Sequence, residues 1–430
     1  MTTEPRAPEA ATDERPLAPE ASSAPSEGFI TVPDTLPGYV NRWWQGVRAG
    51  NLGSLPIVVG LVVIAITLGL LDETFLVARN FTNLLLQMAP VATIAIGVVF
   101  VLLIGEIDLS VAFVSAVGGV SMTLLLRPEN PGWPWWLAIG VALVLTTAIG
   151  LAHALIITKA GVPSFVVTLA GLLIWSGVVL ILTLNVSTTG TIRIQNETVV
   201  GLANNFLPIA WGWVVGWVVV GGYALSQLQR ARARRTAGLG AKPLIVLALQ
   251  VAGLALVTFG AVFYANRDRG VPTITVILMA LLVLWTFIAA RTRFGRHVYA
   301  IGGNPEAARR AGINVDRVRI SVFMIAGFMA GLGGIFFASR LRSVATSAGG
   351  GQLLLNVIAA AVIGGTSLFG GTGRVVSALL GALVITAIDN GMGLLDLSQG
   401  PKFVITGLVL LAAVLVDALS KRRRAARGIV

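Results

Sequence analysis

The sequence contains no cysteine, and its 430 residues include only two histidines. The absence of cysteine excludes disulfides, thiolate metal sites and cysteine nucleophiles. His153 and His297 lie far apart in the chain and have no carboxylate at metal-ligand spacing, so we expect structural or interfacial roles for them and no metal site. The sequence also lacks a G-x-x-x-x-G-K-[ST] segment, so we expect no ATP binding through a P-loop of its own.

Charged residues are scarce as well. They make up 12% of the chain, whereas a soluble protein usually carries about a quarter. Hydrophobic residues make up 56%, and apolar runs of about 20 residues recur along the whole chain. These runs do not alternate apolar and polar residues, which excludes a membrane β-barrel. The sequence therefore predicts an all-α polytopic membrane protein with about 10–12 transmembrane helices.

Twelve apolar segments are the candidates for these helices, with boundaries accurate to several residues. They are approximately 55–72, 84–104, 107–126, 134–158, 164–184, 207–226, 243–264, 272–290, 319–339, 353–371, 374–395 and 402–419. Residues 51–420 thus form the predicted transmembrane domain. Residues 1–50 lack the apolar core of a signal peptide, and we expect a disordered, acidic and Pro-rich tail that ends in a basic pre-membrane segment. A second basic tail is expected at 421–430.

The formal net charge of +12 is compatible with a nucleic-acid partner, but in a membrane protein it indicates the positive-inside bias, which we adopt. The basic run at 229–242 and the tail at 421–430 fall on one side if each segment spans once. The loop at 127–136 falls on the other side and is poor in Lys and Arg. The sequence therefore predicts a multi-pass protein with both termini in the cytoplasm and no nucleic-acid partner.

Two stretches of the sequence resemble each other. VLLIGEIDLSVAF (101–113) and AAVIGGTSLFGGT (360–372) share Ile-Gly, two variable residues, Asp or Ser, and Leu, with apolar residues on both sides. Corresponding breaks in two halves are typical of transporters built from repeats. The sequence thus predicts an internal repeat, although chance or simple helix-hairpin chemistry also explains so short a match. It leaves open whether the halves are parallel or inverted.

Polar residues at membrane depth are the next candidates for function. Glu106 and Asp108 lie between the second and third apolar segments, and Asp389 and Asn390 lie inside the eleventh. Such residues are costly in lipid and normally face the interior of the bundle or a cavity. They indicate either a polar lining for a hydrophilic substrate or a proton relay. For Asp108, which is followed by Leu-Ser, capping of the next helix is the alternative.

IGGNPEAARRAGIN (301–314) has the pattern of a soluble, capped helix between two apolar segments. Asn304 is the expected N-cap, Pro305 the first helical residue and Gly312 the stop signal. Arginines are frequent around it. Three interpretations remain open: a well-formed loop, a helix that lies on anionic lipid, and a rigid peg that docks on a cytoplasmic partner protein.

Five stretches of the sequence together resemble a known protein family. They are GEIDLSV (105–111), VPSFVVTLAG (162–171), RTRFGRHVYAIGGNPEAARRAGINV (291–315), VIGGTSLFGGTG (362–373) and DNGMGLLD (389–396). They resemble the permease subunits of bacterial ABC importers for monosaccharides, and the resemblance covers nearly all of residues 50–420. SRL (339–341), DNGM (389–392) and the additional spans near 207–264 make it look most like the xylose permease branch of this ribose/xylose-type family.

The resemblance implies a subunit of an ATP-driven importer that carries a monosaccharide, xylose or a similar pentose, across the bacterial cytoplasmic membrane by alternating access. It implies no catalysis and no cofactor bound by this chain, because a separate cytoplasmic ABC ATPase uses ATP and Mg²⁺. The other implied partners are an extracytoplasmic sugar-binding protein and a second permease copy, expected to be identical. The family's coupling segment, here 291–318, docks on the ATPase, and its matching residues are Gly303, Asn304, Pro305, Glu306, Ala307, Arg309 and Gly312.

A neutral sugar needs dispersed hydrogen-bond partners along its path, so the candidate pathway residues are polar groups within or beside apolar runs. They are Glu106, Asp108, Asn356, Asp389 and Asn390. This chain has Leu354 and Asn356 where the family commonly has an acidic pair, and Ala112-Phe113 where it commonly has Gly-Ser, so these positions bear on which sugar is carried. Two other functions remain as alternatives: a proton-coupled secondary transporter that uses the intramembrane carboxylates, and a membrane scaffold without transport.

Overall fold

The computed structural model describes residues 35–48, 55–128, 132–238 and 241–425. The predicted disordered tail over residues 1–34 and the second half of the predicted basic tail, 426–430, lie outside the described residues. Within the predicted pre-membrane segment, Leu36–Arg48 forms helix α1.

Eight of the described helices are long and apolar enough to cross a membrane. They are α3 (Ala78–Leu103), α5 (Trp135–Lys159), α6 (Ser164–Leu184), α8 (Ile209–Thr236), α9 (Leu244–Ala265), α10 (Thr273–Arg291), α13 (Val315–Leu341) and α15 (Val376–Leu394). Four further apolar helices are α2 (Leu55–Leu71), α4 (Val111–Leu125), α14 (Leu353–Ile363) and α16 (Gln399–Ala425), the last apolar over Gln399–Ala412. Each predicted segment overlaps one of these helices, so the predicted all-α polytopic fold is confirmed.

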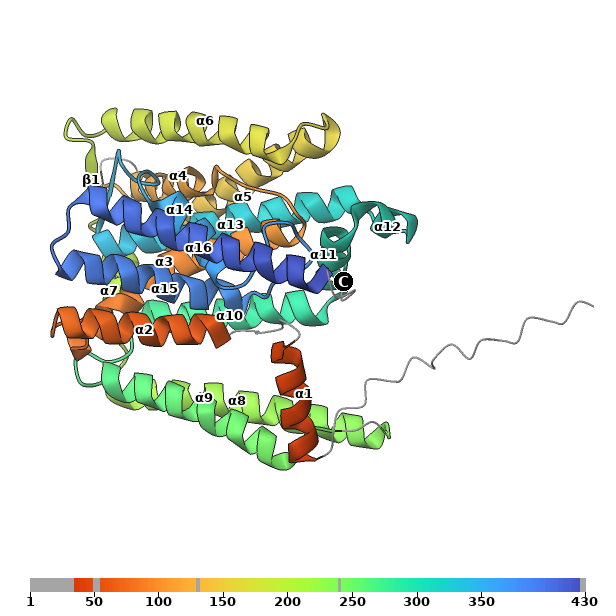
Figure 1. Ribbon diagram of the computed structural model, residues 1–430. Coiled ribbons are helices and arrows are strands. Elements are labelled where there is room, and N and C mark those ends of the chain that lie inside the picture. Colours follow the sequence, from red (N-terminus) through yellow and green to blue (C-terminus); the bar gives the residue numbers. More distant parts are fainter. Residues whose placement is uncertain (1–34, 49–54, 129–131, 239–240, 426–430) are drawn as a thin grey trace, which may run out of the picture.

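The remaining elements define the two ends of the bundle. Helices α11 (Arg293–Gly303) and α12 (Pro305–Arg310) lie at one end, called here the α12 end, near the last turns of α16 (Figure 1). Helix α7 (Glu197–Asn204) and the strands β1 (Thr191–Arg193) and β2 (Ser343–Ala345) lie at the opposite end, called the ribbon end. The strands pair antiparallel with Ile192 opposite Val344. The apolar pattern predicts neither strand, because each has only three residues.

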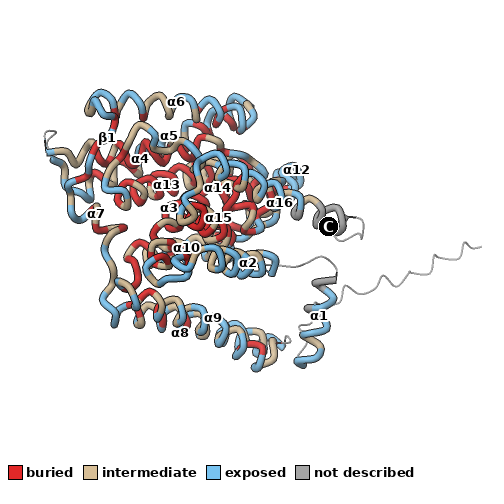
Figure 2. The backbone as a smooth tube through the Cα atoms, turned by 60° about the vertical axis from the view of Figure 1, so that its left-hand side comes forward, coloured by how far each residue is buried: buried red, intermediate tan, exposed pale blue. Residues whose placement is uncertain are grey.

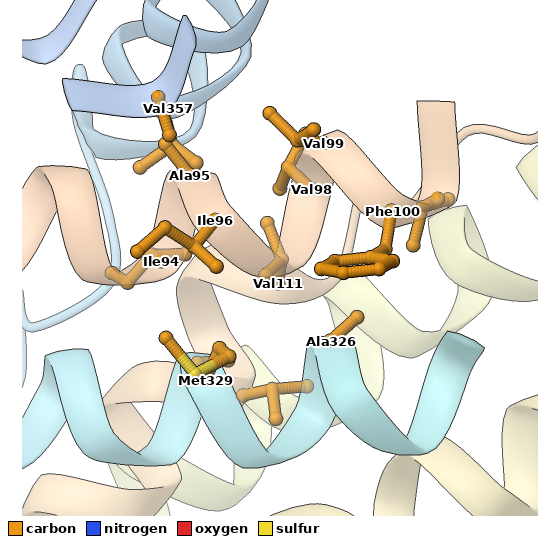
Figure 3. Packing of buried hydrophobic residues seen from close by; sticks show 14 of the residues in the cluster. Ile94, Ala95, Ile96, Val98, Val99, Phe100, Val111, Ala326, Met329 and Val357 are labelled. Carbon is orange, nitrogen blue, oxygen red and sulfur yellow. The ribbon is translucent and has the colours of Figure 1, made fainter. Parts of the chain in front are cut away.

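Helix α13 lies at the centre of the bundle and packs against α3, α4 and α5. Buried residues concentrate on these helices, on α14 and on α15, whereas most residues of α6, α8 and α9 are exposed or half-buried (Figure 2). Figure 3 shows Ile94, Ile96 and Phe100 of α3 among Ala326 and Met329 of α13. Because the outer helices are apolar and exposed, their exposed faces are those that contact lipid in a membrane.

Glycines allow the central helices to approach closely. A Cβ atom added at Gly327 of α13 would overlap the carbonyl oxygen of Thr146 on α5, and one at Gly150 of α5 would overlap the carbonyl oxygen of Phe323. On the other side of α13, a Cβ at Gly334 would overlap the carbonyl oxygen of Ser115 on α4. Lipid provides little hydrophobic drive between helices, so this close packing is what holds them together.

Several predicted segments differ from the helices in length. Segment 353–371 extends beyond α14, which ends at Ile363; the next residues form a loop in which Gly365, Gly370 and Gly371 adopt positive φ, a conformation that ends a helix. Segment 207–226 is shorter than α8, which continues to Thr236 through QRARARRT. Arg, Ala and Gln are good helix formers, so α8 extends past its apolar part.

The packing of α13 gives a stability prediction. We expect Gly327→Leu to lower the thermal stability of the purified protein strongly, because the added side chain has no room against Thr146 of α5. Overpacking of a buried site typically costs about 1–3 kcal/mol. Gly253 of α9 is the matched control, since an added Cβ there meets nothing within 4 Å. Equal melting temperatures for Gly327→Leu and Gly253→Leu in detergent would contradict this account of the core.

Candidate functional site

Helix α12 has the capped geometry that its sequence predicts. The Asn304 side chain accepts a hydrogen bond from the backbone N–H of Ala307 (2.9 Å), and Pro305 occupies the first helical position. Glu306 in the first turn pairs with Arg309 (3.3 Å) and Arg310 (3.5 Å). Gly312 follows the helix with φ of 82°, a left-handed conformation that suits glycine. A cap at each end keeps this short helix ordered between α11 and α13.

Most of α12 faces outward. All the predicted coupling residues, Gly303, Asn304, Pro305, Glu306, Ala307, Arg309 and Gly312, are exposed. Ala308 is the exception, with 4% of its surface exposed, and it belongs to the main apolar core. One buried methyl group therefore fixes the helix to the bundle, and the charged face is left accessible to another protein.

Three segments that are distant in sequence meet beneath α11. The backbone N–H of Gly371, in the loop after α14, donates to the carbonyl oxygen of Leu103 at the end of α3 (3.0 Å). Gly302 at the end of α11 lies so close to both that a Cβ there would overlap the Leu103 oxygen. The two breaks of the predicted repeat thus lie at the same end of the bundle and in contact, since Gly370 packs on Gly105.

Tyr299 of α11 strengthens this junction. Its hydroxyl donates to the carbonyl oxygen of Gly373 (3.0 Å). Burial raises the pKa of the Tyr299 hydroxyl above its ordinary value, against a smaller opposing effect of Arg374. The hydroxyl therefore keeps its proton, and α11 stays linked to the loop between α14 and α15.

Glu106 forms an ion pair rather than a free charge at membrane depth. It follows α3, and its Oε1 lies 2.8 Å from Nη2 of Arg319 in the second turn of α13. The side chains are 15% and 24% exposed, so water screens the pair only in part. Because α13 begins directly after the α12 segment, this pair joins the start of α13 to the turn between α3 and α4.

Asp108 lies two residues before the N-cap of α4, which is Ser110 and has no side-chain cap hydrogen bond. Its Oδ1 accepts from the backbone N–H of Ser110 (2.8 Å) and from the Ser110 hydroxyl (2.6 Å), directly before α4. Ser110 Oγ lies 3.4 Å from Nδ1 of His153, and Trp175 donates to His153 Nε2 (3.2 Å). Nε2 must then be the acceptor nitrogen and Nδ1 the protonated one. The network gives His153 the predicted structural role and ties α4, α5 and α6 together.

Asn390 lies near the ribbon end, in a cluster of amides. It exchanges two hydrogen bonds with Asn80 of α3, at 2.8 and 3.0 Å. Its amide nitrogen also lies 3.4 Å from Oε1 of Gln87. Both asparagines are buried, so these bonds satisfy polar groups that would otherwise be costly in the apolar interior. The cluster joins α15 to the first turns of α3.

Asn356 and Asp389 lie on the neighbouring helices α14 and α15. These helices are antiparallel, because Gly381 packs on Ala360 and Gly364 packs on Ser377. In this register Asn356 faces the turn of α15 that contains Thr386. Asn356 Oδ1 and Thr386 Oγ1 are buried, and neither has a hydrogen-bond partner among the described residues. Half-buried Asp389 interacts electrostatically with Arg340 of α13.

The five predicted pathway residues therefore form two groups. Glu106 and Asp108 lie beyond the last turn of α3, and Asn390 contacts its first turn. The 26 residues of α3 place these positions about 39 Å apart. A cavity of about 230 Å³ at the ribbon end, lined by residues that include Arg127 and Arg193, contains none of the five. Whether any of them lines a pathway stays a prediction.

Several residues that contact or neighbour the predicted site residues are not identified from the sequence. They are Arg319, Asn80, Gln87, Arg340, Thr386 and Tyr299. Asn80 and Gln87 are separated by seven residues on one apolar helix, a spacing that places both on one face and marks them as candidates. Arg319 gives no such signal, because its partner comes from a distant part of the chain. No group of three histidine, aspartate or glutamate side chains able to hold a metal ion occurs in the described ranges.

Comparison with known proteins identifies several similar chains. Residues 80–415 match the protein family described as "Branched-chain amino acid transport system / permease component". The chain is 36% identical over 405 residues to the xylose transport system permease protein of Escherichia coli strain K12, which covers 94% of this chain and 100% of that protein. It is 32% identical over 368 residues to the ribose import permease protein of Bacillus subtilis strain 168, which covers 86% of this chain and 94% of that one. No solved structure matched the chain.

The Glu106–Arg319 pair gives a prediction that a double-mutant cycle tests. We expect Glu106→Gln and Arg319→Gln each to reduce the free energy of unfolding in micelles by about 1–3 kcal/mol, because each leaves a partly buried charge without its partner. The double variant should lose clearly less than the sum. The exposed pair Glu306–Arg310 is the control, with side chains 59% and 81% exposed and an expected coupling below about 0.5 kcal/mol. Additive losses at Glu106 and Arg319 would contradict the pairing.

Proposed function

The chain belongs to the family of branched-chain amino acid transport system permease components, and we propose that it is the permease subunit of an ATP-driven sugar importer in the bacterial cytoplasmic membrane. A family match over most of the chain and the eight long apolar helices support a multi-pass membrane transport subunit. The main support for an ATP-driven mechanism is α12, an ordered, outward-facing helix. Its sequence matches the coupling segment of the permeases that the chain resembles.

The proposed substrate is a pentose, with xylose first. The family description names branched-chain amino acids, but the relatives that align along nearly the whole chain are named for xylose and ribose transport. We give the full-length relatives more weight, since one family description covers many branches. The candidate pathway groups also suit a neutral, hydroxyl-rich molecule. Asn356 Oδ1 and Thr386 Oγ1 are buried and free to hydrogen-bond with sugar hydroxyls that pass between α14 and α15.

The proposed partners follow from the two ends of the bundle. A cytoplasmic ABC ATPase binds at α12 and uses ATP and Mg²⁺, so this chain itself catalyses no reaction and needs no cofactor. An extracytoplasmic sugar-binding protein delivers the sugar at the ribbon end, and a second, identical copy of the chain completes the pathway. Nucleic acid has no part in this assembly, because the positive charge serves membrane orientation.

The proposed orientation places the α12 end in the cytoplasm. The described part of α16 ends there, and the chain enters α2 from the same end (Figure 1). The arginine-rich end of α8 also lies there. This agrees with the positive-inside rule and puts both termini in the cytoplasm.

ATP hydrolysis in the partner is coupled to transport by a displacement of α11 and α12, which the bundle transmits to the other helices. Alternating access requires two packings of similar free energy, and ATP binding in the partner favours one of them through its contact with α12. Displacement of this segment acts on the end of α3 through Gly302 and on the loop after α14 through Tyr299. The Glu106–Arg319 pair moves the turn between α3 and α4 with the start of α13. The segment made of α11 and α12 thus contacts the turn before α4 and the loop before α15.

The alternative, a proton-coupled transporter, is not favoured. Glu106 is paired with Arg319, Asp108 accepts two hydrogen bonds from Ser110, and Asp389 has Arg340 as an electrostatic neighbour. Glu106 and Asp108 lie at one end of α3 and Asp389 lies near the other, and α3 itself contains no carboxylate between them. A chain of protonatable groups across the membrane is thus not assembled in the described residues. The full-length relatives are named as permeases of transport systems and not as ion-coupled carriers.

Coupling through α12 predicts that Glu306→Arg or Ala307→Trp abolishes ATP-dependent uptake, whereas expression and membrane insertion survive. Both side chains are exposed, so neither change disturbs the core, but each alters the face offered to the ATPase. The measurement is uptake of labelled sugar together with co-purification of the ATPase subunit.

Glu197→Arg is the matched control for this experiment. Glu197 is the first-turn acid of α7, another helix capped by an asparagine, but it lies at the ribbon end. We expect this variant to retain the ATPase subunit in full. Normal binding and stimulation of the ATPase by Glu306→Arg would show that α12 is not the docking element.

Asp389→Asn separates the two energy sources. The substitution keeps size and hydrogen-bonding capacity and removes the charge, so in an ATP-driven importer we expect uptake to fall by less than about tenfold. Dissipation of the proton gradient at constant ATP should leave uptake intact. A proton-coupled carrier would instead lose accumulation after either treatment. Exposed Asp396, beyond the end of α15, provides the control substitution Asp396→Asn, which should change nothing.

A further inference from the structure

Helix α1 differs from every other described apolar helix in its low net hydrophobicity and in its direction. It consists of 13 residues, LPGYVNRWWQGVR, about 20 Å in length. It lies across the direction of the long helices at the α12 end, near the turn between α8 and α9 (Figures 1 and 2). Nothing in the transport mechanism above uses it.

The apolar residues of α1 share one face. At 100° per residue, Leu36, Val40 and Trp44 fall within an arc of about 80°. Leu36, Val40 and Trp44 keep 39%, 52% and 48% of their surface exposed, so the bundle covers at most part of this face. Asn41 and Gln45, also exposed, occupy the opposite side of the helix.

The chain holds α1 close to the membrane surface. Only six residues, 49–54, separate it from Leu55, where the apolar helix α2 begins, and six residues reach at most about 20 Å. An exposed apolar face within that distance of the bilayer has lipid as its nearest apolar medium. Tryptophan prefers the boundary between water and lipid, and an arginine beside an apolar arc can reach phosphate groups.

Positive charge at this end favours an anionic surface. The last turns of α8 carry the exposed residues Arg230, Arg232 and Arg235 at the same end. A cluster of arginines next to a membrane attracts anionic headgroups.

We propose that α1 is an interfacial anchor that lies in the plane of the leaflet at the α12 end, inserts its apolar arc between acyl chains and headgroups, and is held on anionic phospholipid by the neighbouring arginines of α8. By holding the start of α2 against one leaflet, it fixes the depth of the bundle in the membrane next to α12. The inference depends only on the membrane-spanning fold and stands whether or not the substrate is a sugar.

Because the chain has no cysteine, single cysteines test this directly in the full-length protein. Val40→Cys on the apolar arc and Gln45→Cys on the opposite side carry an environment-sensitive fluorophore in vesicles of phosphatidylglycerol and phosphatidylcholine. We expect blue-shifted emission at position 40 that lipid-attached nitroxide quenches, and red-shifted emission at position 45 that aqueous iodide quenches. Leu36→Cys and Asn41→Cys form a second pair with the same expectation.

Three results would overturn the proposal. The first is equal quenching by iodide at positions 40 and 45, which would mean that α1 is in water. The second is a label at 40 that neither quencher reaches, which would mean that protein covers this face. The third is identical quenching after phosphatidylcholine replaces all phosphatidylglycerol, which would exclude recognition of anionic lipid. A marked rise in iodide quenching at position 40 after that replacement supports it.

Discussion

Close packing of α13 against α3, α4 and α5 is the constraint on which the rest of the structure depends. Apolar side chains in a membrane gain little by leaving lipid for another helix, so the fit of the helices must supply the stability. Gly327 and Gly334 bring the α13 backbone to the carbonyl oxygens of α5 and α4, where a larger residue would overlap them. A helix held so closely on three sides moves with its neighbours as one body.

This rigidity gives the α12 segment its mechanical importance. The segment enters α13 directly, and the first turns of α13 carry Arg319, which pairs with Glu106 at the turn between α3 and α4. Gly302 and Tyr299 fix α11 to the end of α3 and to the loop before α15. We therefore expect a force on α12 to reach the short helices α4 and α14 and the helices next to them, whereas the peripheral helices α8 and α9, which pack mainly on each other, can adapt to lipid.

The sequence predicts local features well and distant pairings poorly. All twelve apolar segments correspond to helices, and the Asn304 cap of α12 forms as expected, because hydropathy and capping depend on residues within a few positions of one another. The turn that Asp108 forms with Ser110 is equally local. By contrast, the Glu106–Arg319 pair and the Asn80–Asn390 exchange depend on the tertiary arrangement. A polar side chain at membrane depth marks Glu106 and Asn390 as unusual, but only the fold identifies their partners and places them at opposite ends of α3.

We propose that the chain moves a pentose only when an ATPase acts on its α12 end. The most direct measurement is xylose accumulation in proteoliposomes that contain this chain, its ATPase and its binding protein, with each component omitted in turn. We predict accumulation against a gradient only when all three proteins and ATP are present, and no response to an imposed proton gradient. Accumulation driven by a proton gradient in vesicles that contain this chain without an ATPase would contradict the claim.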